Sequence, residues 1–161
     1  MLKKKTKAQS AVEFALILPI LVIVLTGILE VSHLVFVYVS VFNASREAAR
    51  YGAATGTVGS IKQYQDCTNI RNAALKLRFL ANFTASTISV KYDTGPGTTQ
   101  SVECQNMTTT TWANVTSGSR IVVTVTATFR PLFRLVPTPT FNISSMAART
   151  LLGTVKLPVT P

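Results

Sequence analysis

The sequence predicts an α+β protein: a long N-terminal transmembrane helix, then a small extracytoplasmic domain with a helix packed on an antiparallel sheet of about four strands. An apolar run over Phe14–Phe42 indicates the membrane helix. Alternating Val- and Thr-rich segments in the second half indicate the strands. Only 14% of the 161 residues are charged and 47% are hydrophobic, so part of the chain is expected to lie outside water. We expect a basic leader at 1–8, a transmembrane and membrane-proximal helix at 9–55, and the domain at 56–161.

The net charge of +10 is unevenly placed. Four lysines in the first eight residues precede the apolar run: Lys3, Lys4, Lys5 and Lys7. Positive charge stays on the cytoplasmic side of a membrane, so we expect a single-pass protein of the cytoplasmic membrane with its N-terminus inside and its C-terminal domain outside. Residues 51–161 carry ten basic and three acidic groups. No nucleic-acid-binding motif accompanies this charge, so we expect contact with anionic envelope polymers or an acidic partner, and no nucleic acid.

The apolar run is long enough to span a bilayer. Residues 14–29 contain no charge, and Phe14–Phe36 supplies 23 residues where about 20 suffice. One alternative is a buried core helix, which so small a domain could hardly cover on all sides. Another is a removable secretory signal, but the run exceeds the usual 7–15 residues and no small-x-small site ends it.

Three titratable groups flank or interrupt the run. Glu13 is either a helix-start acid that reaches back to water or a carboxylate that needs a cationic partner in an assembly. Glu30 and His33 are three residues apart and share a helix face. They mark the outer interface, with Tyr38 as an anchor, or they form a proton relay.

Three blocks of the sequence resemble one family. Ala8–Pro19 reads AQSAVEFALILP, Gly27–Glu30 reads GILE, and Asn43–Ala53 reads NASREAARYGA. In this order they are similar to TadE-like proteins, the pseudopilins or minor pilins of the Tad (Flp) pilus system. The blocks cover about the first third of the chain. The remainder resembles the family only in its general pattern, a pair of cysteines and Val- and Thr-rich strands.

The resemblance implies processing by a prepilin peptidase. With Glu13 as the fifth mature residue, the cut falls between Ala8 and Gln9, and Phe14 matches the aromatic position after the glutamate. The family usually has Gly where Ala8 stands. The implied partners are the lipid bilayer, the peptidase, and other Tad pilins or pilus-assembly proteins. Self-association and display on an adhesive cell-surface pilus are further expectations. The rival interpretation is an uncleaved envelope protein whose outer domain binds a partner without entering a fibre.

The remaining elements are predicted from local patterns. The long helix should continue through 43–54 and end at the glycines that follow, before a linker or turn at 57–65. Asp66 caps a second helix to about Ala81, with an apolar side formed by Ile70, Ala74, Leu77 and Leu80. Strands are predicted at 87–92, 99–105, 120–129 and 140–152, with 145–152 alternatively helical. Trp112, in a polar loop at 106–118, either covers the sheet or makes an adhesive contact.

The cysteines and the histidine limit the possible chemistry. Outside the membrane, Cys67 and Cys104 are expected to form a disulfide that ties the second helix to the second strand; two free thiols are the alternative. One His and two Cys are too few for a zinc site, and His33 lies in the apolar run. We therefore expect no enzyme, no metal and no cofactor.

Overall fold

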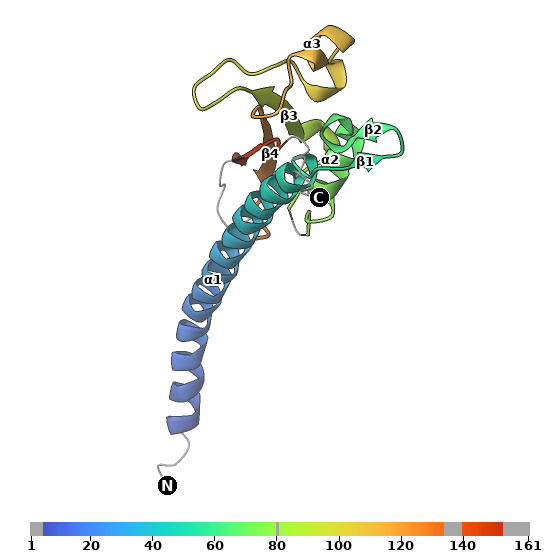
Figure 1. Ribbon diagram of the computed structural model, residues 1–161. Helices are drawn as coiled ribbons and strands as arrows, with labels where there is room; N and C mark the ends of the chain where they lie inside the picture. Colours follow the sequence, from blue (N-terminus) through green and yellow to red (C-terminus); the bar gives the residue numbers. More distant parts are fainter. Residues whose placement is uncertain (1–4, 80, 134–139, 153–161) are drawn as a thin grey trace, which may run out of the picture.

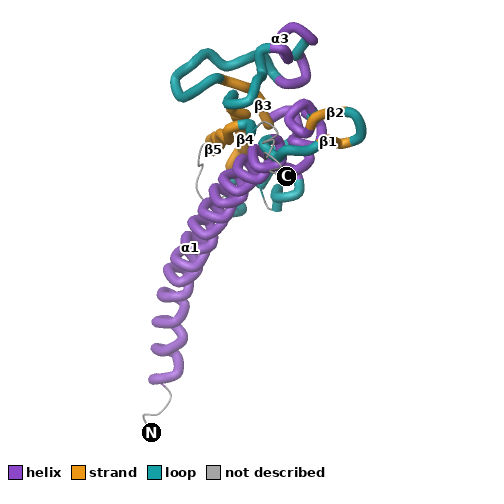
Figure 2. Tube along the Cα trace, in the orientation of Figure 1, coloured by secondary structure: helices purple, strands orange, loops and turns teal. Residues whose placement is uncertain are grey.

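The computed structural model describes residues 5–79, 81–133 and 140–152, with residues 5–8 described as backbone alone. Helix α1 (Lys5–Gly52) projects from a small head, and its second half lies along that head (Figures 1 and 2). The head contains the helices α2 (Cys67–Leu75) and α3 (Thr109–Ala113), and the strands β1 (Thr57–Val58), β2 (Ile61–Lys62), β3 (Ile88–Asp93), β4 (Arg120–Phe129) and β5 (Phe141–Thr150). The predicted α+β class with a long N-terminal helix is confirmed.

Helix α1 is continuous over 48 residues although Pro19 lies within it. A proline removes one backbone donor, a loss that membrane helices tolerate. The helix ends at Gly52, one of the glycines expected to end it. Its first half stands clear of the head, whereas one side of its second half is buried, at Val37, Val41, Ala44, Ala48 and Ala49.

Helix α2 begins where the sequence predicts and ends earlier. The Asp66 carboxylate accepts a hydrogen bond from the Asn69 backbone N–H at 3.1 Å, so the predicted cap is confirmed. The predicted end at Ala81 is wrong, because the chain turns after Leu75 and brings Ala81 and Phe83 into the core. Leu77 is correspondingly 37% exposed, and Leu80 lies outside the described residues.

The main sheet has the order β3-β4-β5, with both pairs antiparallel. The strands predicted at 87–92, 120–129 and 140–152 are confirmed, and the alternative helix at 145–152 is wrong because β5 continues to Thr150. The expected linker at 57–65 contains the β1–β2 hairpin and a 3-10 helix (Gln63–Gln65). Further 3-10 helices are Ala85–Thr87 and Cys104–Asn106.

The strand predicted at 99–105 is wrong. This segment runs beside the edge of β3, where side chains take the place of a strand. The Tyr92 N–H donates to Ser101 Oγ at 3.0 Å, and the Val90 N–H donates to the Glu103 carboxylate at 3.1 Å. These edge donors are satisfied without a ladder, so the main sheet has three strands within the described residues.

The core lies between α1 and the sheet. The predicted inner face of β4 is confirmed, since Ile121, Val123, Val125 and Ala127 are at most 1% exposed. Small residues of α1 face these side chains and allow the helix to approach closely. The head is therefore built directly on the C-terminal half of α1.

Candidate functional site: the membrane helix and its junction with the head

The N-terminal half of α1 is an apolar surface that the head does not cover. Within the described residues, one helix is long and apolar enough to cross a membrane, Gln9–Gly52, and its most apolar window has a mean hydropathy of 2.7 with none of it buried. The hydroxyls of Thr26 and Ser32 donate to backbone carbonyls of their own helix. Neither hydroxyl therefore needs a water molecule as its hydrogen-bond acceptor.

Glu13 is the carboxylate at the start of this surface. Among the described side chains, the hydrogen bond at Glu13 comes from the Gln9 amide, whose Nε2 donates to Oε1 at 3.3 Å. That contact supplies no compensating charge. Gln9, Glu13 and Phe14 all lie in the continuous helix α1, as does the backbone of Ala8. Lys3 and Lys4 lie outside the described residues, and of Lys5 and Lys7 only the helical backbone is described.

Glu30 and His33 mark the level at which the head first reaches α1. The Phe133 N–H, in the connection after β4, donates to Glu30 Oε1. The His33 ring lies 5.2 Å from the ring of Phe129. Within the described part of the chain, Glu30 Oε2 and His33 Nδ1 are buried without a hydrogen-bond partner. The two residues therefore contact the head rather than each other.

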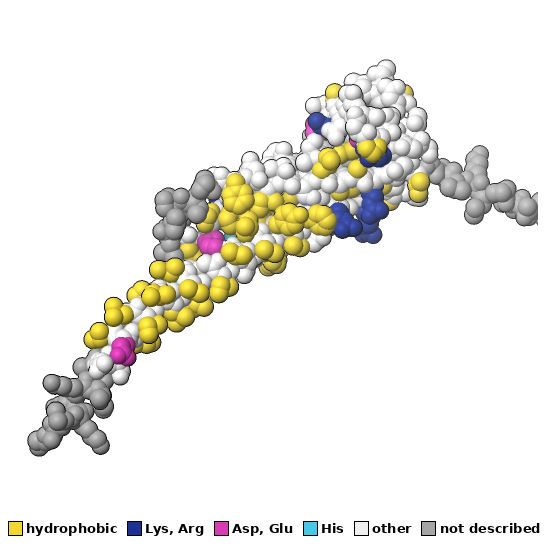
Figure 3. All heavy atoms as spheres, turned by 90° about the vertical axis from the view of Figure 1, so that its left-hand side faces the viewer, with side chains coloured by type: hydrophobic (Ala, Val, Ile, Leu, Met, Phe, Trp, Pro, Cys, Tyr) yellow, Lys and Arg dark blue, Asp and Glu magenta, His cyan; other side chains and the backbone are white. Residues whose placement is uncertain are grey.

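The side of α1 that faces away from the head stays apolar above this level. Its exposed residues follow a three-four spacing: Val31, Val35, Tyr38, Val39 and Phe42. The rings of Tyr38 and Phe42 stack at 6.4 Å, and the Arg46 guanidinium lies 5.2 Å from the Phe42 ring centroid. Figure 3 shows this hydrophobic surface running along α1 up to a group of Lys and Arg side chains. A helix that faced only water here would present polar residues.

The top of α1 is clamped to the head by close packing. Gly52 has no side chain, and a Cβ placed there would overlap Ile121 Cδ1 and lie 3.2 Å from Ile70 Cδ1. About two turns below, Ser45 Oγ and Ser145 Oγ are 3.1 Å apart across the helix–sheet interface. The position of the head relative to the membrane helix is therefore set by side-chain contacts.

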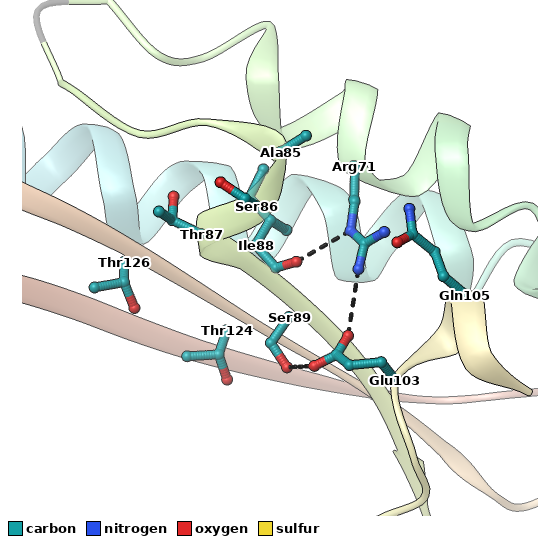
Figure 4. Close-up of a pocket in the computed structure, with 10 residues that line it drawn as sticks. All are labelled: Arg71, Ala85, Ser86, Thr87, Ile88, Ser89, Glu103, Gln105, Thr124 and Thr126. Carbon is teal, nitrogen blue, oxygen red and sulfur yellow. Dashed lines mark hydrogen bonds and ion pairs between the residues drawn. The ribbon is translucent and has the colours of Figure 1, made fainter.

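A cleft of the described head lies at the other side of the sheet (Figure 4). Its volume is about 620 Å³, and its wall includes hydroxyl-bearing residues of the 3-10 helix Ala85–Thr87, of β3 and of β4. The buried Arg71 donates to the Ile88 carbonyl at 3.0 Å and to Glu103 at 3.3 Å. The same carboxylate accepts from the Ser89 hydroxyl. The charged groups thus compensate each other, and the described residues contain no cluster of three His, Cys, Asp or Glu side chains that could hold a metal ion.

The disulfide lies beside an aromatic cluster at the top of the head. Cys67 and Cys104 are bonded, with their Cα atoms 5.8 Å apart. Cys104 begins a 3-10 helix, so the expected link from α2 to a second strand is corrected to a link from α2 to that turn. Trp112 packs on Tyr92 at 5.3 Å and on Tyr64 at 6.0 Å, which favours the covering role over an adhesive one. Burial, and secondarily the nearby Tyr64, raises the pKa of Tyr92.

A protein-family model matches most of the N-terminal helix. The profile of the family described as TadE-like protein matches residues 8–50. The N-terminal segment is TadE-like. This match covers 43 of the 161 residues and includes Glu13, the bare half of α1 and the part of α1 packed on the head. Comparisons with curated proteins and with solved structures return no match.

The N-terminal segment is therefore similar to TadE-like proteins, and the helix that it includes is long and apolar enough to cross a membrane. The blocks of this segment could be identified from the amino-acid sequence alone. The role of Arg71 could not be predicted from the sequence. Nothing local to α2 indicates that the Arg71 guanidinium pairs with Glu103, which lies 32 residues away. The close packing of Gly52 against the sheet was not predicted either, although Gly52 lies within the third block.

Proposed function

We propose that the chain is a pseudopilin or minor pilin that takes part in Tad (Flp) pilus assembly. Helix α1 anchors it in the cytoplasmic membrane of a bacterium, with the leader inside and the head outside. The prepilin peptidase removes the leader between Ala8 and Gln9. The chain performs no reaction of its own and is the substrate of that peptidase. The head is then the part that a surface pilus displays for adhesion.

The position of Glu13 is the observation that carries this proposal. The head reaches α1 at Glu30, so the lipid-facing segment ends near Leu29. Counting back about 20 residues, at about 1.5 Å each, places the inner edge of the hydrocarbon near Ser10 and Glu13 roughly 5 Å inside it. A carboxylate at this depth with an uncharged amide as its described contact is costly, which favours a cationic partner supplied from elsewhere.

Removal of the leader would create such a cation. The new N-terminal amine of Gln9 would begin the helix, four residues before Glu13. A parallel neighbour whose Gln9 amine pairs with Glu13 is displaced along the axis by about 6 Å, the rise of four helical residues. Because an unpaired charge in lipid is unfavourable, this pair would fix the axial register of neighbouring chains.

The exposed stripe of α1 supports lateral packing of the same helices. Tyr38, Val39 and Phe42 lie above the hydrocarbon on the side away from the head. Packing against another α1 would remove them from water at about 25 cal/mol per Å² of apolar area. The stripe continues into the first half of α1, which is apolar and exposed on all sides, so the same helix would pack against its neighbours in the membrane and in the fibre.

A pair of glutamate substitutions tests the proposal. Glu13→Ala should leave membrane insertion unchanged or improved, because it removes a charge from lipid, and should reduce recovery of the chain in sheared surface fibres. Glu47→Ala is the matched control, because Glu47 lies outside the membrane and pairs with Arg50 at 2.7 Å on the exposed side of α1. An exposed pair of this kind contributes at most about 1 kcal/mol, so fibre recovery should be normal. Normal fibre recovery of Glu13→Ala would refute the role of the carboxylate.

The leader cut has its own test at Ala8. Introducing the residue that the family usually has, by Ala8→Gly, should preserve or accelerate loss of the leader in cells that contain the peptidase. Electrophoresis of pulse-labelled protein follows the loss, and cells that lack the peptidase serve as the control. If the parent chain and the Ala8→Gly variant both keep the lysine leader in the membrane fraction, the result would favour the rival anchored protein that never enters a fibre.

A further inference from the structure

The exposed phenylalanines of the described head gather at the end of the head nearest the membrane helix. Phe79, Phe133 and Phe141 are 69%, 41% and 46% exposed, and the neighbouring Leu132 is 60% exposed. We name these four residues the apolar underside. The core does accept this residue type, since Phe83 and Phe129 are buried. Exposure of the other three therefore requires its own explanation.

The apolar underside is held at one level of α1. The Phe79 ring meets the Phe36 ring edge-on at 5.7 Å, and the Phe79 carbonyl accepts from Ser40 Oγ at 3.2 Å. The Phe133 N–H donates to Glu30 Oε1. The loop after α2 and the connection after β4 accordingly both lie at the lower end of the head (Figure 1).

Phe141 is fixed to the same level through the core. Its ring lies 5.1 Å from the ring of Phe129, which in turn lies 5.2 Å from the ring of His33. The residues of α1 that make these contacts, from Glu30 to Ser40, span about 15 Å of helix axis. Segments far apart in the sequence therefore place their apolar side chains within one layer at the lower end of the head.

This layer coincides with the outer limit of the hydrocarbon. The uncharged run Phe14–Leu29 ends immediately below Glu30, so this layer lies at the outer end of the lipid-facing helix. The apolar underside also continues the exposed apolar surface of α1, and Figure 3 shows hydrophobic side chains gathered where the helix meets the head. The exposed Arg130, next to Phe129, is placed to meet lipid phosphates.

We propose that the apolar underside inserts into the membrane leaflet that faces the head, so that the head rests on the lipid rather than standing free above it. The partner is a lipid surface. Glu30 and Phe36 lie about 120° apart around the helix, so the underside flanks α1 on two sides. A fluid leaflet closes around such an arrangement, whereas a second copy of the chain would have to match two separate faces. The proposal rests on the membrane span of α1 and does not require leader removal or fibre assembly.

Tryptophan substitution reports the position of each side chain relative to lipid. The full chain is used with Trp112→Phe, which keeps an aromatic ring between Tyr64 and Tyr92. Phe79→Trp and Phe133→Trp are introduced singly, and the protein is reconstituted in phosphatidylethanolamine–phosphatidylglycerol vesicles with or without brominated acyl chains. Both variants should show blue-shifted tryptophan emission, and the brominated acyl chains should quench most of that emission.

Two further positions make the outcome decisive. Met146→Trp is the control on the head, because Met146 is 65% exposed and its neighbour Ser145 meets α1 at Ser45, roughly 22 Å above Glu30. It should not be quenched. Val24→Trp reports the span itself and should be quenched.

Quenching at Val24 without quenching at both Phe79 and Phe133 overturns the proposal and leaves the membrane span intact. Blue-shifted emission at those two positions that depends on the protein-to-lipid ratio and not on bromine also overturns it, because a second copy would then cover the underside. Absence of quenching at Val24 refutes the span and, with it, the proposed function.

Discussion

Substitution of Gly52 by alanine should weaken the joint between the membrane helix and the head. The added Cβ would overlap Ile121 Cδ1 and press on Ile70, and both isoleucines are fully buried. Overpacking of a close-packed core costs about 1–3 kcal/mol. The gain in helix propensity from Gly to Ala is at most about 1 kcal/mol and is smaller at the last helical residue. We therefore expect a net loss of about 1–2 kcal/mol in the free energy of unfolding, the difference between these two effects.

The clash has a specific remedy. Ile121→Val removes the Cδ1 atom that the new Cβ overlaps and by itself costs about 0.5–1.5 kcal/mol. The double variant Gly52→Ala/Ile121→Val should be more stable than the sum of the two single effects predicts, by about 1 kcal/mol or more. Gly27→Ala is the control, because no heavy atom lies within 4 Å of a Cβ built there, and it should be neutral or slightly stabilising.

Urea unfolding of the full chain in detergent micelles measures these effects. Trp112, the single tryptophan, packs on Tyr92 and reports the folded head. Strict additivity of the two substitutions, or a Gly52→Ala variant as stable as the parent, would refute the close approach of α1 to the sheet.

Three further predictions concern the head. Cys67→Ser/Cys104→Ser, or reduction, should lower the free energy of unfolding by about 4 kcal/mol on the chain-entropy model for a separation of 37 residues; an unchanged urea midpoint would contradict it. Burial raises the pKa of Tyr92 above its unfolded value, so the stabilising effect of its protonated form is complete below about pH 10 and declines as the pH rises further. Urea titrations from about pH 9 upward should show this decline, and Tyr92→Phe should remove it. Arg71→Ala should cost about 2–4 kcal/mol by leaving Glu103 and the Ile88 carbonyl without their donor, so a neutral effect would instead favour a binding role for the cleft.

The elements with strong local signals could be predicted from the sequence. The apolar run defines α1, Asp66 places the start of α2, and the alternation in Arg120–Phe129 identifies the central strand and its buried face. Each of these signals is contained in one continuous segment, so no knowledge of distant contacts is needed.

The missed features depend on contacts between distant segments. The strand predicted at 99–105 has strand-like residues, but Ser101 and Glu103 bind the edge of β3 through their side chains. Helix α2 ends early because Phe83 must reach the core. The apolar underside was not predicted for the same reason, since Phe79 and Phe133 are brought to one level only by the folded head.

The most direct test of the central claim is the N-terminal residue of the mature chain. Intact-mass spectrometry of protein from the membrane fraction and from sheared fibres identifies it in one measurement. Our account predicts a chain that begins at Gln9, with its new amine four residues from Glu13. A chain that retains the lysine leader in both fractions would contradict it.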